Sequence, residues 1–285
     1  MIRKFNGADV LIYALLGVIA LLMLYPLCNV IAVSLSSANG YANHPLMLWP
    51  HEFDATAYRW VISHHLILSS YGNTVIITVV GTLISMFLTA TLAYPLSTAD
   101  LQGKKTLMSL LVFTMFFNGG MVPNYYLVRS LGLVDSIWAL MLPGAMSVYN
   151  MILMKNSFEG LPVSLKESAR IDGASDLGIF IRIVLPLSMP IIATLTLFYA
   201  VGKWNSYFNA ILYIRDRSKW TLQLLLREIV YQTQTLLNDS TDIASLPSQS
   251  IKYAVIVVAI LPIMCVYPFL QRFFVKGVMV GAVKG

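Results

Sequence analysis

The chain has 285 residues, of which 58% are hydrophobic and only 11% are charged, and its mean hydropathy is +0.73. Soluble domains carry about 25% charged residues, so this chain has too few charges to cover a soluble globule, and its long apolar runs exclude a disordered chain. The net charge of +6 does not indicate nucleic acid, because no dense basic run with interleaved aromatic residues occurs. The composition indicates a protein that crosses a membrane several times.

A helix needs about 20 mostly apolar residues to cross the about 30 Å of hydrocarbon in a membrane. Six stretches of the chain meet this requirement. In chain order they cover residues 10–35, 73–97, 106–127, 136–156, 187–212 and 251–270. Arg3 and Lys4 precede the first stretch, as in a secretory signal, but its apolar run exceeds the core of about 7–15 residues that signals have, which favours a retained anchor. The sequence predicts an all-α membrane protein with six transmembrane helices in a single transmembrane domain, residues 1–285.

The loop charges predict the orientation. Eleven Lys and Arg residues fall on the side that holds both termini, seven fall on the other side, and Lys203 lies inside the fifth stretch. Basic residues accumulate in cytoplasmic loops, so both termini are predicted to be cytoplasmic. The outer loops then cover residues 36–72, 128–135 and 213–250. A structureless loop as long as the last is often functional, and a plain solvated excursion is the alternative.

Chemistry that could power transport is missing from the sequence. All 13 acidic residues fall in or beside the predicted loops, which argues against a proton relay. The turn Gly103-Lys104-Lys105-Thr106 lacks the earlier glycine of a phosphate-binding loop, and Cys28 and Cys265 match no metal or redox spacing. Neither a catalytic residue nor a metal site is predicted. Lys203 is expected to face a wet cavity or to snorkel outward, so the energy source is expected on another subunit.

The segment 159–186, on the predicted cytoplasmic side, carries the clearest pattern. Pro162 followed by Ser164 favours a helix start, and Gly173 favours its end. Mostly small residues share one face of that helix at helical spacing: Leu165, Ser168, Ala169, Asp172 and Gly173. Such a face lets another protein approach closely, although an ordinary interfacial amphipathic helix fits the same pattern.

The order Glu167-Ser168-Ala169, Asp172-Gly173-Ala174 and Leu185-Pro186 resembles the EAA loop of ABC-importer permeases, with Ser168 where that family usually has Ala. Almost the whole chain is similar to the maltose-type carbohydrate permeases, and specifically to their second-permease type and the branch associated with complex oligosaccharides and polysaccharide fragments. The stretches that carry this similarity include Phe116-Phe117-Asn118-Gly119-Gly120, Leu131-Gly132-Leu133, Leu142-Pro143-Gly144, Trp204-Asn205 and Gln271-Arg272-Phe273-Phe274.

This resemblance implies the type I ABC-importer permease fold and a non-catalytic subunit in the cytoplasmic membrane. The subunit would pass an oligosaccharide or polysaccharide fragment from an extracytoplasmic binding protein into the cytoplasm by alternating access. A partner ABC ATPase dimer would bind ATP and Mg, this chain would bind no cofactor, and a second permease would complete the path. The alternative is a self-contained secondary transporter or channel.

The resemblance also implies residue roles. The ATPase-coupling set is Glu167, Ser168, Ala169, Asp172, Gly173, Ala174, Leu185 and Pro186. A C-terminal tail would contact the ATPase through Gly281, Lys284 and Gly285, and the loop 213–250 would contact the binding protein.

A path for sugar also needs aromatic faces for the rings and amides for the hydroxyls. Side chains of these types stand at plausible depths, with helix packing or an interfacial aromatic belt as the alternative for each: Asn118, Trp204, Asn205, Tyr207 and Asn209.

Overall fold

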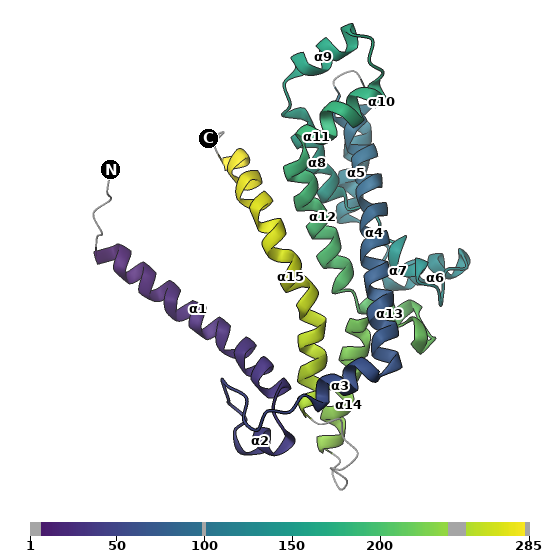
Figure 1. Ribbon diagram of the computed structural model, residues 1–285. Coiled ribbons are helices and arrows are strands. Elements are labelled where there is room, and N and C mark those ends of the chain that lie inside the picture. The colour runs from purple at the N-terminus through teal and green to yellow at the C-terminus, as the bar shows by residue number, and fades with distance from the viewer. Residues whose placement is uncertain (1–6, 99–100, 239–248, 283–285) are drawn as a thin grey trace. The chain divides into compact units, whose positions relative to one another are not determined.

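The computed structural model describes residues 7–98, 101–238 and 249–282, which form helices and connecting turns with one isolated antiparallel bridge between Ser36 and Phe53. The chain divides into two compact units. The first consists of Met1–Leu68 and Leu225–Pro262, and the second of Ser69–Leu224 and Ile263–Gly285. The helices agree with the all-α fold that the composition predicts (Figure 1).

The first unit begins with the apolar helix α1 (Gly7–Ser34), whose side chains are almost all exposed in the isolated chain from Val10 to Leu27. Only its end is packed, where Ala32 and Val33 are buried with Met47. The remaining helices of this unit are α2 (Ala38–Asn43), α3 (Thr56–Ser63), most of α14 (Leu222–Asn238) and the beginning of α15 (Gln249–Ala282). Such an exposed apolar helix fits contact with lipid or with another membrane subunit.

The second unit begins in α4 (His65–Ser97), the longest of its helices. The elements that follow in chain order are α5 (Lys104–Phe116), α6 (Met121–Ser130), α7 (Trp138–Met141), α8 (Val148–Glu159), α9 (Val163–Ile171), α10 (Asp176–Ile179), the π-helix η1 (Phe180–Val184), α11 (Leu185–Leu187), α12 (Met189–Trp204), α13 (Phe208–Tyr213) and the 3-10 turn η2 (Arg217–Lys219).

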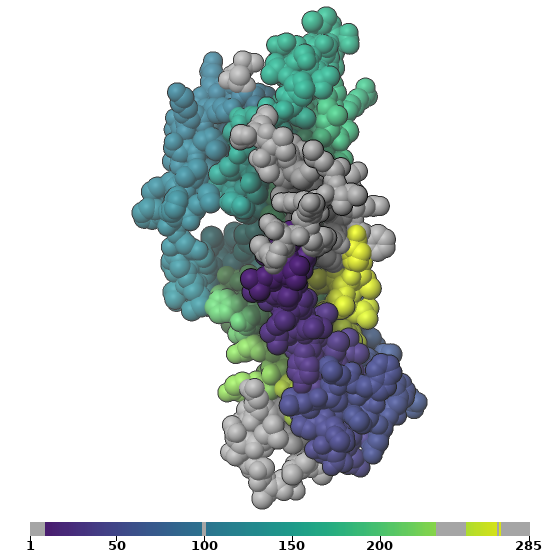
Figure 2. Space-filling model, turned by 90° about the vertical axis from the view of Figure 1, so that its left-hand side faces the viewer, coloured from purple at the N-terminus to yellow at the C-terminus, as the bar shows by residue number. Residues whose placement is uncertain are grey.

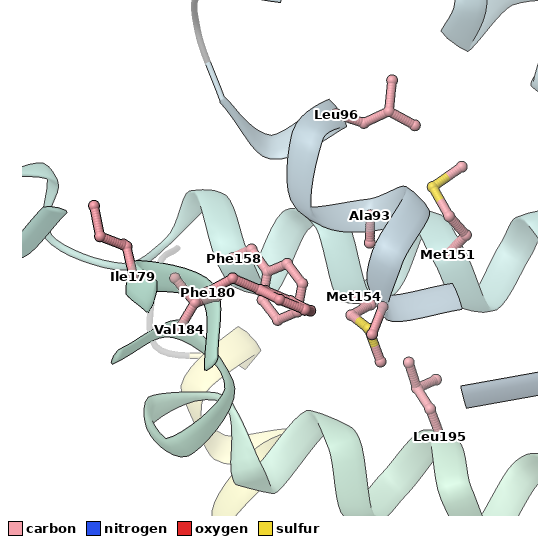
Figure 3. Packing of buried hydrophobic residues seen from close by; sticks show 10 residues of the cluster. Ala93, Leu96, Met151, Met154, Phe158, Ile179, Phe180, Val184 and Leu195 are labelled. Carbon is pink, nitrogen blue, oxygen red and sulfur yellow. The ribbon is translucent and has the colours of Figure 1, made fainter. Parts of the chain in front are cut away.

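Two apolar clusters hold the second unit together. In the first, Phe158 of α8 is fully buried and meets the ring of Phe180 edge-on, with 6.3 Å between the ring centroids. Figure 3 shows this pair surrounded by side chains of α4, α8, η1 and α12. The second cluster joins α4, α6, α7 and α13 through buried side chains such as Ile77, Leu140 and Tyr213. These clusters position the segment that follows α8 and the breaks in the helices.

Three helices are long and apolar enough to cross a membrane: α1 over Asp9–Ser34, α4, and α15 over Gln249–Val266. Two bent pairs raise the number to five if each pair is one span. In the first pair α5 and α6 meet at 113°, and in the second Asp176–Leu187 and α12 meet at 81°.

Three of the predicted stretches are therefore not continuous helices. The stretch 106–127 breaks at Gly119-Gly120, where Gly120 has a φ of +88°. The stretch 136–156 breaks into α7 and α8 around Pro143-Gly144, because proline has no N–H to donate and its ring disturbs the preceding turn. The stretch 187–212 breaks after α12 at residues 205–207. Hydropathy averages over such breaks, so it does not detect them.

Other predicted boundaries shift as well. The helix α4 begins at His65 and not at residue 73, and α15 continues to Ala282, beyond the predicted end of the sixth stretch. The predicted loop 213–250 contains η2 and the amphipathic 17-residue helix α14, and residues 239–248 lie outside the described part of the chain.

Candidate functional site

Helix α9 contains the first part of the EAA-like pattern, Glu167-Ser168-Ala169. It begins after Pro162 and ends in a backbone cap, in which Gly173 N–H donates to the Arg170 carbonyl at 3.0 Å and Ala174 N–H donates to the Ala169 carbonyl at 2.9 Å. This pair of bonds is the Schellman motif, which needs a left-handed residue after the helix. Gly173 supplies that residue with a φ of +80°, so the predicted start and stop of the helix are confirmed.

The inner side of α9 rests on the second unit. Lys166 Nζ donates to the Phe158 carbonyl at 3.1 Å, and Ala169 packs against the cluster around Phe158. Arg170 and Asp176 form an ion pair of 3.0 Å across the turn that follows the helix. Burial lowers the pKa of Lys166, and the charge of Glu159 partly opposes that effect. These contacts fix the orientation of α9 around its own axis.

Of the face that the small residues predict, Leu165, Ser168, Asp172 and Gly173 are exposed, and α9 exposes further side chains beside it. Ala169 points inward, whereas Val163 is 62% exposed and Ile171 is 87% exposed. With Glu167 they occupy positions i, i+4 and i+8, so the three side chains form one outward strip. We define these three residues as the outward strip, and helix α9, which carries it, lies at one end of the second unit (Figures 1 and 2). A four-residue spacing of branched apolar residues around Glu167 was the signal for it in the sequence.

The remaining residues of the predicted coupling set lie in two places, the end of α9 and helix α11. Ser168, Asp172 and Ala174 are exposed together with Gly173 at the end of α9. Leu185 and Pro186 lie in α11 instead, where Leu185 packs against the cluster around Phe158 and the chain turns by 81° into α12. These two residues therefore connect the α9 region to a long apolar helix.

A second network fixes the end of α8, from which α9 departs. The Glu159 carboxylate accepts hydrogen bonds from Lys104 at 2.9 Å and from Lys155 at 2.7 Å. Burial raises the pKa of Glu159, but the hydrogen bonds from the two lysines outweigh burial and leave the pKa below its ordinary value. The first turn of α5 and the last turn of α8 are thereby tied together.

The predicted sugar-path residues have different surroundings. Trp204 is only 5% exposed and meets the edge of Tyr71, with 5.9 Å between the ring centroids. Asn118 Oδ1 accepts from Gly120 N–H at 2.9 Å, and Asn205 Nδ2 donates to the Val201 carbonyl at 3.0 Å, so both amides hold helix ends.

Tyr207 and Asn209, in contrast, are exposed. Among the described residues no hydrogen bond or ring contact joins Asn118 to Asn205, Tyr207 or Asn209. The sugar path thus stays a prediction, and within it Tyr207 and Asn209 are the side chains free to meet a ligand. Of the predicted tail residues, Gly281 lies in α15, and Lys284 and Gly285 lie outside the described residues.

A carboxylate clamp lies at the opposite end of the second unit from α9. Asp135, which has a φ of +59°, accepts hydrogen bonds from the backbone N–H groups of Arg215 and Asp216, both at 3.0 Å. Lys219 Nζ donates to the same carboxylate at 3.1 Å and to the Asp135 carbonyl at 2.8 Å. The hydrogen bonds from Asp216 N–H, Lys219 and Arg215 N–H lower the pKa of Asp135 to about 2 from 3.8. The clamp fixes the turn after α13 to the turn before α7.

The clamp gives a prediction on pH. A carboxyl whose pKa is lower in the folded state stabilises that state above its unfolded pKa, and the stabilisation is lost as the pH falls through the folded value. We expect Asp135→Asn, which tolerates the positive φ, to lower the melting temperature of the purified protein at neutral pH. The difference from wild type should shrink as the pH falls below 3.8 toward about 2. Lys219→Met should have a smaller effect, and a difference that does not depend on pH would contradict the explanation.

With this geometry established, comparison with known proteins defines the class of the chain. Residues 74–280 match the family described as "Binding-protein-dependent transport system inner membrane component". The chain belongs to this family of transport-system membrane proteins.

Two proteins of Bacillus subtilis are similar to this chain over almost their whole length. The chain is 49% identical over 280 residues to the polygalacturonan/rhamnogalacturonan transport system permease protein YtcP of Bacillus subtilis, covering 97% of this chain and 98% of that protein. It is 47% identical over 285 residues to protein LplC of the same organism, covering 99% and 96%.

A solved bacterial ABC transporter involved in the import of the acidic polysaccharide alginate matches with a TM-score of 0.87 and 33% identity, over 95% of this chain and 99% of that one. A second alginate transporter chain, at 17% identity and a TM-score of 0.58, supports the fold alone. The predicted membership in the ABC-importer permeases and the helical permease fold are thus confirmed.

Proposed function

We propose that this chain is one of two permease subunits of an ATP-driven importer that moves acidic oligosaccharides into the cytoplasm. A partner ABC ATPase dimer hydrolyses ATP, and an extracytoplasmic binding protein delivers the substrate. The family name, with its dependence on a binding protein, supports the arrangement of partners. The relatives named for polygalacturonan/rhamnogalacturonan and for alginate support a substrate with carboxylate groups.

The observation that carries the proposal is the outward strip on α9. Its residues Val163, Glu167 and Ile171 lie on a helix held rigidly from behind by Lys166 and Ala169, with a glycine cap at its end. An exposed apolar strip on a rigid short helix suits insertion into a groove of another protein. In this proposal α9 enters the ATPase, and the turn at Leu185-Pro186 passes its movement to α12.

Transport then follows from two states of the permease. ATP binding draws the ATPase subunits together, α9 moves with them, and the equilibrium between inward-open and outward-open states shifts, because ATP-bound ATPase binds one state more tightly than the other. The chain itself supplies no chemistry to this cycle, and its residues bind the ATPase and shape the path.

We also propose that the chain has six spans with both termini in the cytoplasm. The three continuous helices and the two bent pairs supply five spans, and α7 with α8 supplies the sixth in spite of its break at Pro143-Gly144. This arrangement places α9 and the basic residues Lys104, Lys155 and Lys166 on the cytoplasmic side, as the distribution of positive charge requires.

Co-purification from the native membrane tests the proposal, with every associated chain identified. An ATPase, a second permease and a binding protein are expected, and the reassembled complex should take up an acidic oligosaccharide only with ATP. Recovery of the chain alone under conditions that preserve other membrane complexes, or uptake by the purified chain driven by an ion gradient, would establish the self-contained transporter instead.

A further inference from the structure

Lys203 lies in the last turn of α12, the apolar helix of the second bent pair. Its stem crosses α4 at Gly81, where an added Cβ would lie 2.6 Å from Lys203 Cδ, so the absence of a side chain on Gly81 makes room for the lysine. Its Nζ donates to the Met141 carbonyl at the end of α7, at 3.4 Å. The lysine therefore reaches into the packing of α4 and α7.

The helix α4 faces this lysine with polar side chains. We define its polar face as Thr74, Thr78, Gly81, Thr82, Ser85 and Thr89, which fall within an arc of about 100° at 3.6 residues per turn. The two ends of this face have partners: Thr74 Oγ1 accepts from Leu222 N–H at 2.8 Å, and Thr89 Oγ1 lies 2.7 Å from the hydroxyl of Tyr199. Tyr199 stands one turn before Lys203 on α12, so α12 runs along the polar face.

The middle of the polar face is different. The hydroxyl oxygens of Thr78, Thr82 and Ser85 are buried and have no hydrogen-bond partner among the described protein atoms. Thr82 is only 5% exposed, and Ser85 is fully buried. These three residues flank Gly81, the position that the lysine crosses. A buried hydroxyl is nearly always hydrogen-bonded, so this group of hydroxyls beside an ammonium is the kind of lining that a polar ligand or its water requires.

The charge of Lys203 specifies the ligand further. Within the described residues no carboxylate lies within 4.0 Å of its Nζ, and the single long bond to a neutral carbonyl leaves donor capacity for more. An ionisable side chain inside a membrane is costly, and a functional partner is the first explanation to test. A neutral sugar can accept from an ammonium, but only an anionic group also offsets the charge.

We propose that Lys203 binds the carboxylate groups of uronate units as they pass through the permease, and so determines specificity for acidic over neutral oligosaccharides. The inference rests on the proposed function and names the residue that recognises the charge. Lys203 lies two residues before the break at residues 205–207, which contains the exposed Tyr207. The α4 hydroxyls around Gly81 complete the polar lining on the other side of the lysine.

The test compares two substrates of equal length in the complete transporter. The complex with its ATPase, second permease and binding protein is placed in proteoliposomes, and uptake of trigalacturonate is measured against its fully methyl-esterified, neutral form. Lys203→Met should lower uptake of the acid about 10- to 100-fold, the range for losing a hydrogen bond to a charged group, and should leave uptake of the ester unchanged. Lys105→Met, the same change at an exposed lysine on α5, serves as the control.

Two further variants retain a positively charged side chain at position 203. Lys203→Arg should retain preference for the acid, and Gly81→Ala should weaken it, because the new methyl displaces the flexible end of the lysine without meeting backbone. If Lys203→Met lowers uptake of both substrates equally, or of neither, the role of Lys203 is wrong, but the proposed importer function is not contradicted. If the wild-type complex takes up only the ester, the acidic substrate class is wrong and the inference falls with it. If Lys203→Met does not assemble, Gly81→Ala decides: unchanged preference overturns the inference.

Discussion

Ile171→Asp is expected to separate this permease from its ATPase. Ile171 is 87% exposed at the end of the outward strip and has no packing role in the second unit, so the change leaves the helices folded. A carboxylate placed in a buried interface beside Glu167 is desolvated without a partner. Central interface residues account for about 2 kcal/mol or more of binding free energy, so binding of the ATPase should weaken at least about thirtyfold.

The measurement is the amount of ATPase that co-purifies with the variant, together with substrate-stimulated ATP hydrolysis. Leu46→Asp is the matched control, because Leu46 is 78% exposed in the first unit and lies outside the predicted coupling segment. It should retain the ATPase. Full ATPase binding and uptake by Ile171→Asp would contradict the assignment of the outward strip.

Gly173→Val is expected to uncouple the permease from its ATPase. The cause is the backbone conformation at residue 173, and not the volume of the new side chain. No atom lies within 4 Å of a Cβ built on Gly173, but its φ of +80° is a conformation that costs an L-residue about 1–2 kcal/mol, and more when the side chain is β-branched. This cost is comparable to the about 1–3 kcal/mol that the two capping hydrogen bonds contribute, so the end of α9 should unwind and carry Ile171 out of position. Uptake should fall strongly.

Gly173→Asn separates the two explanations. Asparagine tolerates the left-handed conformation, so this variant should keep ATPase binding and uptake near the wild-type level. If Gly173→Asn and Gly173→Val lose ATPase binding and uptake equally, the ATPase approaches residue 173 closely. In that case the helix cap does not explain why residue 173 is a glycine. Melting temperatures of the isolated permease should be similar for both, because α9 lies at the end of the unit.

The sequence was most informative where one residue has one dominant physical role. Pro162 and Gly173 delimit α9 because a proline favours the first turn and only glycine readily takes the left-handed cap. The apolar runs at α1, α4 and α15 are continuous, so hydropathy detects these three helices, although α4 begins earlier and α15 ends later than predicted. The pattern from Glu167 to Gly173 likewise marked the segment for which we propose the coupling role.

The breaks in the other helices depend on several residues acting together. Pro143-Gly144 and Gly119-Gly120 lie inside apolar stretches whose average hydropathy predicts a continuous span. A proline or glycine in a membrane helix is tolerated when neighbouring groups satisfy the freed backbone, so the sequence alone does not distinguish a break from a kink. At Pro143-Gly144 the neighbouring Met141 is buried in the cluster that also holds Tyr213.

The direction of each side chain on α9 and α12 was also beyond the sequence. Small residues suggested a docking face through Ala169, but contact with the cluster around Phe158 turns that residue inward and leaves the outward strip exposed. Trp204 has the right chemistry for sugar, yet Tyr71 and the surrounding helices bury it. Helical periodicity gives relative angles along one helix, whereas only packing gives the rotation of that helix.

By itself, the sequence determined that this protein is a helical membrane permease and indicated where α9 begins and ends, because charge, hydropathy, glycine and proline act locally and leave a pattern along the chain. The tertiary structure decided what surrounds Lys203. Gly81, Met141 and the α4 hydroxyls lie far from it in sequence, and they meet only because α4, α7 and α12 pack together. Contacts of that kind depend on the distance between helices, which no local pattern encodes.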